Sequence, residues 1–166
     1  MEFSIKIVIL FGAVILTGLS AGLFYAWSVS VIPGTEKVSD LTYLETMQSI
    51  NRAILNFAFF SIFFGSILFL SIASIYQLHN NMLTFWLMLA SSVIYLLGTV
   101  GVTALGNVPL NNELEALNLA EIGSIKLKEF RTYYELNWNK FHLIRTVFAV
   151  GSFLLAVTAV FTQVKN

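Results

Sequence analysis

The run SIASIYQLHNNMLTF at residues 71–85 lies inside the stretch that decides the fold. From Ala53 to Asn112 the chain contains no Asp, Glu, Lys or Arg, and the polar turn His79-Asn80-Asn81 divides this stretch in two. A helix that crosses a membrane needs about 20 mainly apolar residues. We therefore expect two spans here, at about residues 51–77 and 83–106, joined by a tight turn.

Two further runs without charged residues extend from Ile7 to Thr35 and from Thr146 to Val164. Each is long enough for one span, and we place these spans at about residues 5–32 and 138–163. The chain is 57% hydrophobic with 11% charged residues and a mean hydropathy of +0.81, whereas soluble domains carry about 25% charged residues. The sequence predicts an all-α fold, an integral membrane four-helix bundle, as a single transmembrane domain over residues 1–166.

The connections between spans 1 and 2 and between spans 3 and 4 are amphipathic. Residues 35–49 carry apolar side chains at spacings of three, and we expect them to run into the second span without a break. Pro109 is expected to end the third span. The charged segment at about residues 110–136 then predicts one or two amphipathic helices that lie on the membrane surface and cover one end of the bundle as a lid.

Polar and aromatic residues gather at one end of the predicted bundle. Four spans place both termini and the turn at residues 79–81 on one side, while the opposite helix ends carry Tyr25, Asn51, Arg52, Asn107, Asn111, Trp138, His142 and Arg145. Trp138, His142 and Arg145 share one helix face at i, i+4 and i+7. Polar groups that converge from several helices predict a pocket at this mouth.

Simpler interpretations of these residues stay open. Tyr25 fits an aromatic belt at the membrane interface. Arg52 and Arg145 have side chains long enough to reach the headgroups from a buried backbone. His142 taken by itself fits a structural histidine whose hydrogen bonds are satisfied.

The composition also limits cofactors and partners. The chain has no cysteine, so disulfides and thiolate metal sites are excluded, and its net charge of zero argues against nucleic acid as a partner. One histidine at the mouth does not supply a zinc or non-haem iron site, so we predict no metal and no cofactor, although haem on His142 stays open. The expected partners are the lipid bilayer and a hydrophobic small molecule. A homo-oligomer stays open. We place the protein in a bacterial-type inner membrane with both termini in the cytoplasm.

The chain resembles the anthrone-oxygenase-like family of small four-helix membrane proteins. The resemblance extends over nearly the whole chain and rests on five motifs in order: Ala21-Gly22-x-x-Tyr25, Val31-x-Pro33-Gly34, Met47-Gln48-x-Ile50-Asn51-Arg52, Asn107-Val108-Pro109-Leu110-Asn111 and Trp138-x3-His142-x2-Arg145. The resemblance implies an oxidoreductase that converts an anthrone to an anthraquinone with dioxygen and without a cofactor.

This implied activity assigns roles to the residues at the mouth. His142 would be the general base, Arg145 and Asn107 would stabilise the oxyanion, and Tyr25 and Trp138 would stack on the planar substrate. Asn51, Arg52 and Asn111 complete the expected substrate-binding set. The alternative is a non-catalytic membrane protein that binds a lipid or a quinone-like molecule in the same pocket.

Overall fold

The computed structural model describes residues 5–163, which form four long helical units and one short connecting helix. The units are α1 (Ile5–Ala26) with η1 (Trp27–Val31) and α2 (Ile32–Thr35); α4 (Phe57–Gln77); α5 (Met82–Ile94) with η2 (Tyr95–Gly101), η3 (Thr103–Asn107) and α6 (Val108–Glu115); and α7 (Ser124–Phe161). The connecting helix is α3 (Asp40–Ala53). All four units are long and apolar enough to cross a membrane.

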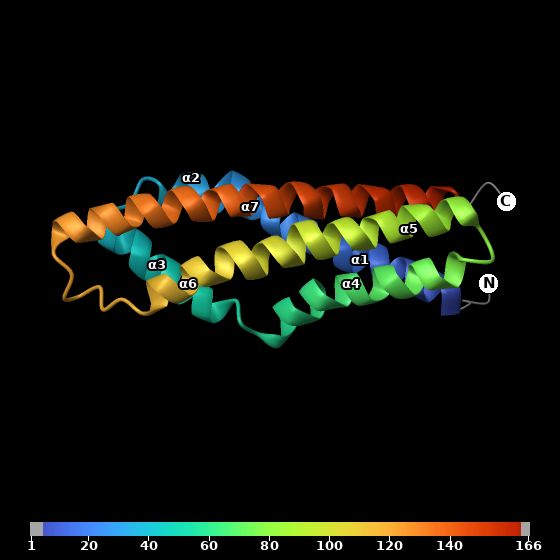
Figure 1. The fold of residues 1–166 in the computed structure, drawn as a ribbon, viewed down its shortest axis with the longest axis horizontal. Coiled ribbons are helices and arrows are strands. Elements are labelled where there is room, and N and C mark those ends of the chain that lie inside the picture. The colour runs from blue at the N-terminus through green and yellow to red at the C-terminus, as the bar shows by residue number, and fades with distance from the viewer. Residues whose placement is uncertain (1–4, 164–166) are drawn as a thin grey trace.

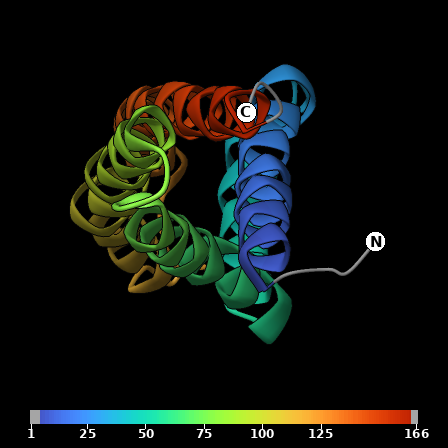
Figure 2. The ribbon, with the colours of Figure 1, turned by 90° about the vertical axis from the view of Figure 1, so that its right-hand side faces the viewer.

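The four units pack around a common axis (Figure 1). Viewed along that axis, α1, α4, α5 and α7 form the four sides of a bundle, and each contacts the next in that order (Figure 2). The start of α1, the turn between α4 and α5, and the end of α7 lie at one end, while α3, α6 and the start of α7 lie at the other. This arrangement confirms the predicted all-α membrane bundle.

One hydrophobic core fills the membrane half of the bundle. Its fully buried members come from all four units and include Ala13, Leu70, Met88, Tyr95 and Ala149. Small residues let α7 approach the third unit closely. A Cβ atom added at Gly98 would overlap the Phe148 side chain, so only glycine fits there. Gly22, by contrast, has open space around it.

A second core lies beyond the first, at the mouth end, where the charged connections pack on one another. Buried side chains of α3, α6, the connection after α6 and the start of α7 meet there: Tyr43, Leu44, Met47, Leu110, Leu114, Leu119, Leu127, Tyr134 and Trp138. Residues 124–136 are therefore the first turns of the 38-residue helix α7 and do not form a separate helix on the membrane surface. The predicted start of the fourth helix at residue 138 differs from the structure: residues 124–136 continue into α7, and Leu127 and Tyr134 are buried in the core shared with α3.

Two predicted boundaries also differ from the structure. The expected unbroken helix from residue 35 into the second span is interrupted at Leu55 and Asn56, because the Asn56 side chain accepts a hydrogen bond from the Phe59 N–H and starts α4 anew. Pro109 does not end the third unit, which continues to Glu115.

The two prolines of the chain explain how these helices continue. Pro33 and Pro109 each follow a five-residue π-helical segment, η1 and η3. The residue before each proline, Ile32 or Val108, donates its N–H five residues back, to Trp27 or Thr103. Proline lacks an N–H and its ring crowds the carbonyl four residues earlier. A wider π turn relieves this crowding, and such turns often occur at functional sites.

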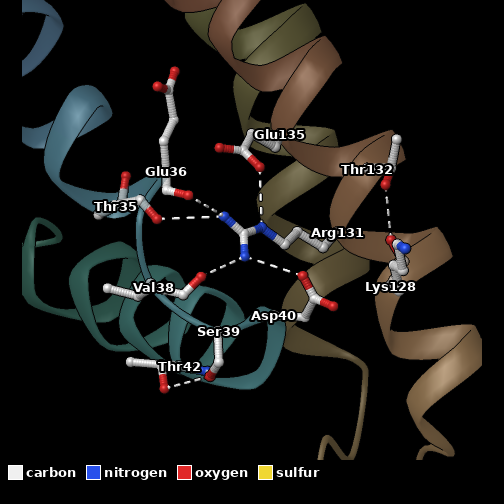
Figure 3. A network of polar contacts seen from close by, with 10 residues as sticks. All are labelled: Thr35, Glu36, Val38, Ser39, Asp40, Thr42, Lys128, Arg131, Thr132 and Glu135. Atoms are coloured by element: carbon white, nitrogen blue, oxygen red, sulfur yellow. Dashed lines mark hydrogen bonds and ion pairs between the residues drawn. The ribbon is translucent and has the colours of Figure 1, made fainter.

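Arg131 joins the start of α7 to the loop between α2 and α3 (Figure 3). Its guanidinium donates hydrogen bonds to Val38 O, Asp40 Oδ1, Glu36 O, Thr35 O and Glu135 Oε2. The group also lies 4.6 Å from the ring centroid of Tyr43. Burial raises the pKa of Tyr43, so this phenol stays neutral beneath the cation. One arginine thus fixes the loop that carries α3.

Replacing Arg131 by alanine is expected to destabilise the protein by at least about 2 kcal/mol, because several charge-assisted hydrogen bonds to a side chain only 11% exposed are lost together. Arg52→Ala is the matched control, since its ion pair with Glu115 is 63% and 47% exposed and such pairs contribute about 1 kcal/mol or less. Thermal unfolding followed by tryptophan fluorescence compares the two. Equal shifts in Tm would contradict the structural role of Arg131.

Candidate functional site

A cavity of about 530 Å³ lies at the mouth end of the bundle, between the two cores. It is bounded by α1 and η1, the end of α3, the link to α4, the first turns of α4, the third unit, and the middle of α7. Its lining consists of Leu23, Phe24, Trp27, Ile50, Asn51, Arg52, Ile54, Leu55, Phe59, Phe60, Phe63, Phe64, Val100, Thr103, Ala104, Val108, Asn111, Asn112, Glu115, Trp138, His142 and Arg145.

Most of the cavity wall is aromatic or aliphatic, and part of this wall faces outward. Leu55 is 66% exposed and Phe64 is 50% exposed on the side of the bundle, yet both line the cavity. Side chains on the flank of a membrane bundle face lipid. The cavity wall is therefore largely apolar and reaches the outer flank of the bundle.

Arg145 supplies a positive charge to this wall. Its guanidinium lies between the rings of Phe24 and Trp138, 4.7 and 5.0 Å from their centroids, and the residue is only 8% exposed. Nη1 donates to Thr103 Oγ1 at 3.4 Å, while Nε and Nη2 donate to His142. Within residues 5–163, no carboxylate forms an ion pair with it. A buried cation without an anionic partner is costly, so it is suited to binding an anionic oxygen.

The hydrogen-bond partners of His142 select one tautomer of its imidazole ring. Nδ1 accepts hydrogen bonds from Arg145 Nε and Nη2 at 3.2 and 2.9 Å. Because arginine has donors only, the imidazole proton must lie on Nε2, which donates to the Phe24 carbonyl at 3.1 Å and lies 3.0 Å from Ser28 Oγ. Both ring nitrogens are thus occupied by hydrogen bonds.

A second polar group lies where α3 and α6 meet α7. Asn111 Oδ1 accepts hydrogen bonds from Trp138 Nε1 at 2.8 Å and from the Tyr134 hydroxyl at 3.0 Å. Asn51 Nδ2 donates to the same hydroxyl at 3.2 Å. The Trp138 ring also stacks on His142, with 5.0 Å between centroids and 7° between planes. Trp138 thus connects this group to the Arg145 side of the cavity.

The structure brings together six of the eight residues that the sequence analysis assigned to the site. Those in the cavity lining are Asn51, Arg52, Asn111, Trp138, His142 and Arg145. Tyr25 is not in the lining and is 58% exposed on the outside of the bundle. Asn107 is buried behind the wall, where Nδ2 donates to the Trp138 carbonyl. Within the described residues, its Oδ1 has no hydrogen-bond partner.

Trp27 and Thr103 also line the cavity, although the sequence analysis did not assign either of them to the site. Both are the first residues of π-helical segments, η1 and η3, that precede the two prolines. A proline near the mouth end of an apolar helix was the available signal, since it predicts a local departure from the regular helix.

A comparison with protein-family models matches residues 56–155 to the model described as anthrone oxygenase. The chain belongs to the anthrone oxygenase family. This confirms the resemblance seen in the motifs. The match to the anthrone oxygenase model includes Asn111, Trp138, His142 and Arg145, whereas Phe24, Trp27 and Asn51 lie outside the matched range. No curated protein and no solved structure matches the chain.

Proposed function

We propose that this membrane protein oxidises a lipophilic anthrone-type substrate with dioxygen, without a cofactor, in the cavity at the mouth of the bundle. The observation that carries the proposal is Arg145, a buried guanidinium that faces an aromatic-lined cavity and has no carboxylate partner within residues 5–163. Membership of the anthrone oxygenase family supports the choice of substrate.

The chemistry needs a group that stabilises negative charge on oxygen. An anthrone carries a carbonyl and an acidic methylene group, and loss of one methylene proton gives an enolate whose charge lies mainly on that oxygen. Three of the five N–H groups of Arg145 contact His142 and Thr103, so two remain for the enolate oxygen. Removing one such preorganised donor typically costs about 3–4 kcal/mol in the transition state.

His142 then acts by positioning Arg145. Its Nδ1 accepts two of the arginine N–H groups, and its Nε2–H is tied to the Phe24 carbonyl. The sequence analysis assigned His142 as the general base, but both of its nitrogens are occupied. We therefore take water as the base that accepts the methylene proton. This water enters the cavity beside the exposed Arg52–Glu115 ion pair, whose residues line the cavity. Asn107, which lies behind the wall, is left out of the reacting set.

The proposed reaction balances without a further reactant. The enolate passes one electron to O₂, and the resulting radical and superoxide combine to a peroxide anion on the former methylene carbon. The outer oxygen of this anion takes up the proton that the methylene group released, which gives a hydroperoxide. Loss of the second hydrogen of that carbon as a proton breaks the O–O bond, so the carbon becomes a carbonyl and hydroxide leaves. One O₂ is consumed for each anthrone, with one oxygen atom in the anthraquinone and the other in water.

Oxygen uptake by the purified, metal-chelated protein with anthrone tests this proposal. We expect saturable uptake above the spontaneous rate, with one O₂ consumed per anthraquinone formed. The variant Ala104→Trp fills the cavity and should abolish the saturable part. Leu97→Trp is the matched control, because Leu97 belongs to the same helical unit, is 66% exposed and lies outside the lining.

Uptake that never exceeds the spontaneous rate, or that Ala104→Trp leaves unchanged, would contradict an oxygenase site in this cavity. In that case the outward-facing apolar wall favours the second candidate, a protein that binds a lipid or a quinone-like molecule. Native mass spectrometry would then detect one unmodified lipid that remains bound through detergent exchange.

A further inference from the structure

The polar group around Trp138 has a hydrogen-bond direction that can be assigned atom by atom. An indole N–H only donates, so the Asn111 atom that faces Trp138 Nε1 at 2.8 Å must be the carbonyl oxygen. The Tyr134 hydroxyl, 3.0 Å from the same oxygen, must donate to it. The lone pair of Tyr134 then accepts from Asn51 Nδ2 at 3.2 Å. Tyr134 is fully buried, so water cannot reverse this order.

This order leaves two polar groups unused on the cavity side. Within the described residues, Asn111 Nδ2 has no hydrogen-bond acceptor and Asn51 Oδ1 has no donor, although both residues line the cavity. One is an N–H donor and the other is a carbonyl acceptor. Both side chains hydrogen-bond the Tyr134 hydroxyl, so the two amides flank one phenol oxygen. A single ligand hydroxyl can accept from Asn111 and donate to Asn51, whereas a carbonyl or an ether oxygen can only accept.

We propose that Asn51 and Asn111 form a subsite for a hydroxyl group of the ligand, separate from the oxygen-binding site at Arg145. Trp138 separates the two sites: Arg145 lies 5.0 Å from its ring centroid, and Asn111 binds its N–H edge. The cavity therefore selects a planar aromatic with an anionic or carbonyl oxygen at one point and a hydroxyl substituent at another. This inference rests on the proposed function, because it takes the cavity as the substrate site.

The test measures binding and needs no turnover. Trp27 and Trp138 line the cavity, so quenching of tryptophan fluorescence reports occupancy by anthraquinone, its 1-hydroxy and 2-hydroxy derivatives, and the matching methyl ethers. A site built to hydrogen-bond a hydroxyl discriminates against analogues that lack it. We expect one hydroxy isomer to bind about tenfold more tightly than anthraquinone, as two neutral hydrogen bonds would give. Its methyl ether should lose this gain.

The variant Asn51→Leu should remove the preference, so that within this variant the hydroxy isomer and anthraquinone bind with equal affinity, whatever the absolute affinity for anthraquinone. Asn118→Leu is the matched control, since Asn118 is exposed and outside the cavity, and it should keep the preference. Equal affinity of the wild type for anthraquinone and both hydroxy isomers would overturn the subsite. A preference for the hydroxy isomer that remains in Asn51→Leu would also overturn it.

Failure of the subsite and failure of the proposed function give different results. Saturable oxygen uptake with unsubstituted anthrone, together with no hydroxyl preference, would overturn the subsite and keep the oxygenase. A hydroxyl preference without uptake would keep the subsite and remove the oxygenase. Absence of binding by every probe would overturn the subsite outright.

Discussion

Replacing Arg145 by methionine is expected to lower kcat/KM for anthrone by about 100-fold or more. Methionine is apolar and of similar length, so it keeps the packing between Phe24 and Trp138 but removes the positive charge and all N–H donors. Losing one donor to an oxyanion typically costs 10²–10³ in rate. Steady-state oxygen uptake, corrected for the spontaneous reaction, measures the loss.

The same variant is expected to unfold at an unchanged or higher Tm. Arg145 is buried, and no carboxylate pairs with it in the part of the chain that the structure describes, so the folded state bears its desolvation cost without a compensating ion pair. Arg145→Lys is the comparison variant: it keeps the charge but loses the planar fork, and we expect an intermediate rate. An Arg145→Met variant that retains wild-type kcat/KM would exclude Arg145 as the oxyanion-binding group.

Replacing His142 by alanine is expected to lower kcat about 10- to 100-fold, whereas His142→Asn should remain within about tenfold of the wild type. The asparagine side-chain oxygen occupies nearly the place of Nδ1 and can accept the hydrogen bonds from Arg145. Alanine leaves those N–H groups without an acceptor, so the guanidinium loses its fixed direction.

This pair of variants separates positioning from general-base catalysis. An amide cannot take up a proton near neutral pH, so a histidine base would make His142→Asn as inactive as His142→Ala. The pH profile gives a second readout. For a positioning residue, kcat/KM of His142→Asn should follow the same pH dependence as the wild type. A pH-dependent limb that is lost in His142→Asn would restore the base assignment.

Much of the architecture could be predicted from local composition. Charge-free runs such as Ala53–Asn112 mark membrane helices because an unpaired charge in lipid is expensive wherever it lies along the helix. The same argument places the polar residues at one mouth, and the face shared by Trp138, His142 and Arg145 needs only the helical repeat. These properties depend on each segment and its solvent, and no knowledge of the neighbouring helix is required.

The path of the charged segment at residues 110–136 could be established only from the tertiary structure. An amphipathic stripe such as that of Leu127 and Tyr134 can be buried equally well against lipid headgroups or against another helix. The choice depends on α3, which provides Tyr43 and Met47 as partners, and on Arg131, which binds the α2–α3 loop. None of these contacts is local in sequence.

The detailed membership of the site was also decided by tertiary structure. Tyr25 and Trp27 are both aromatic and two residues apart, yet Tyr25 lies outside the bundle and Trp27 lines the cavity. The sequence by itself determined which segments cross the membrane and at which end their polar residues meet, because transfer into lipid depends on each side chain alone. Only the tertiary structure decided which of those residues face one another, because the direction of a side chain depends on helix phase, on the π turns before Pro33 and Pro109, and on the packing of neighbouring helices.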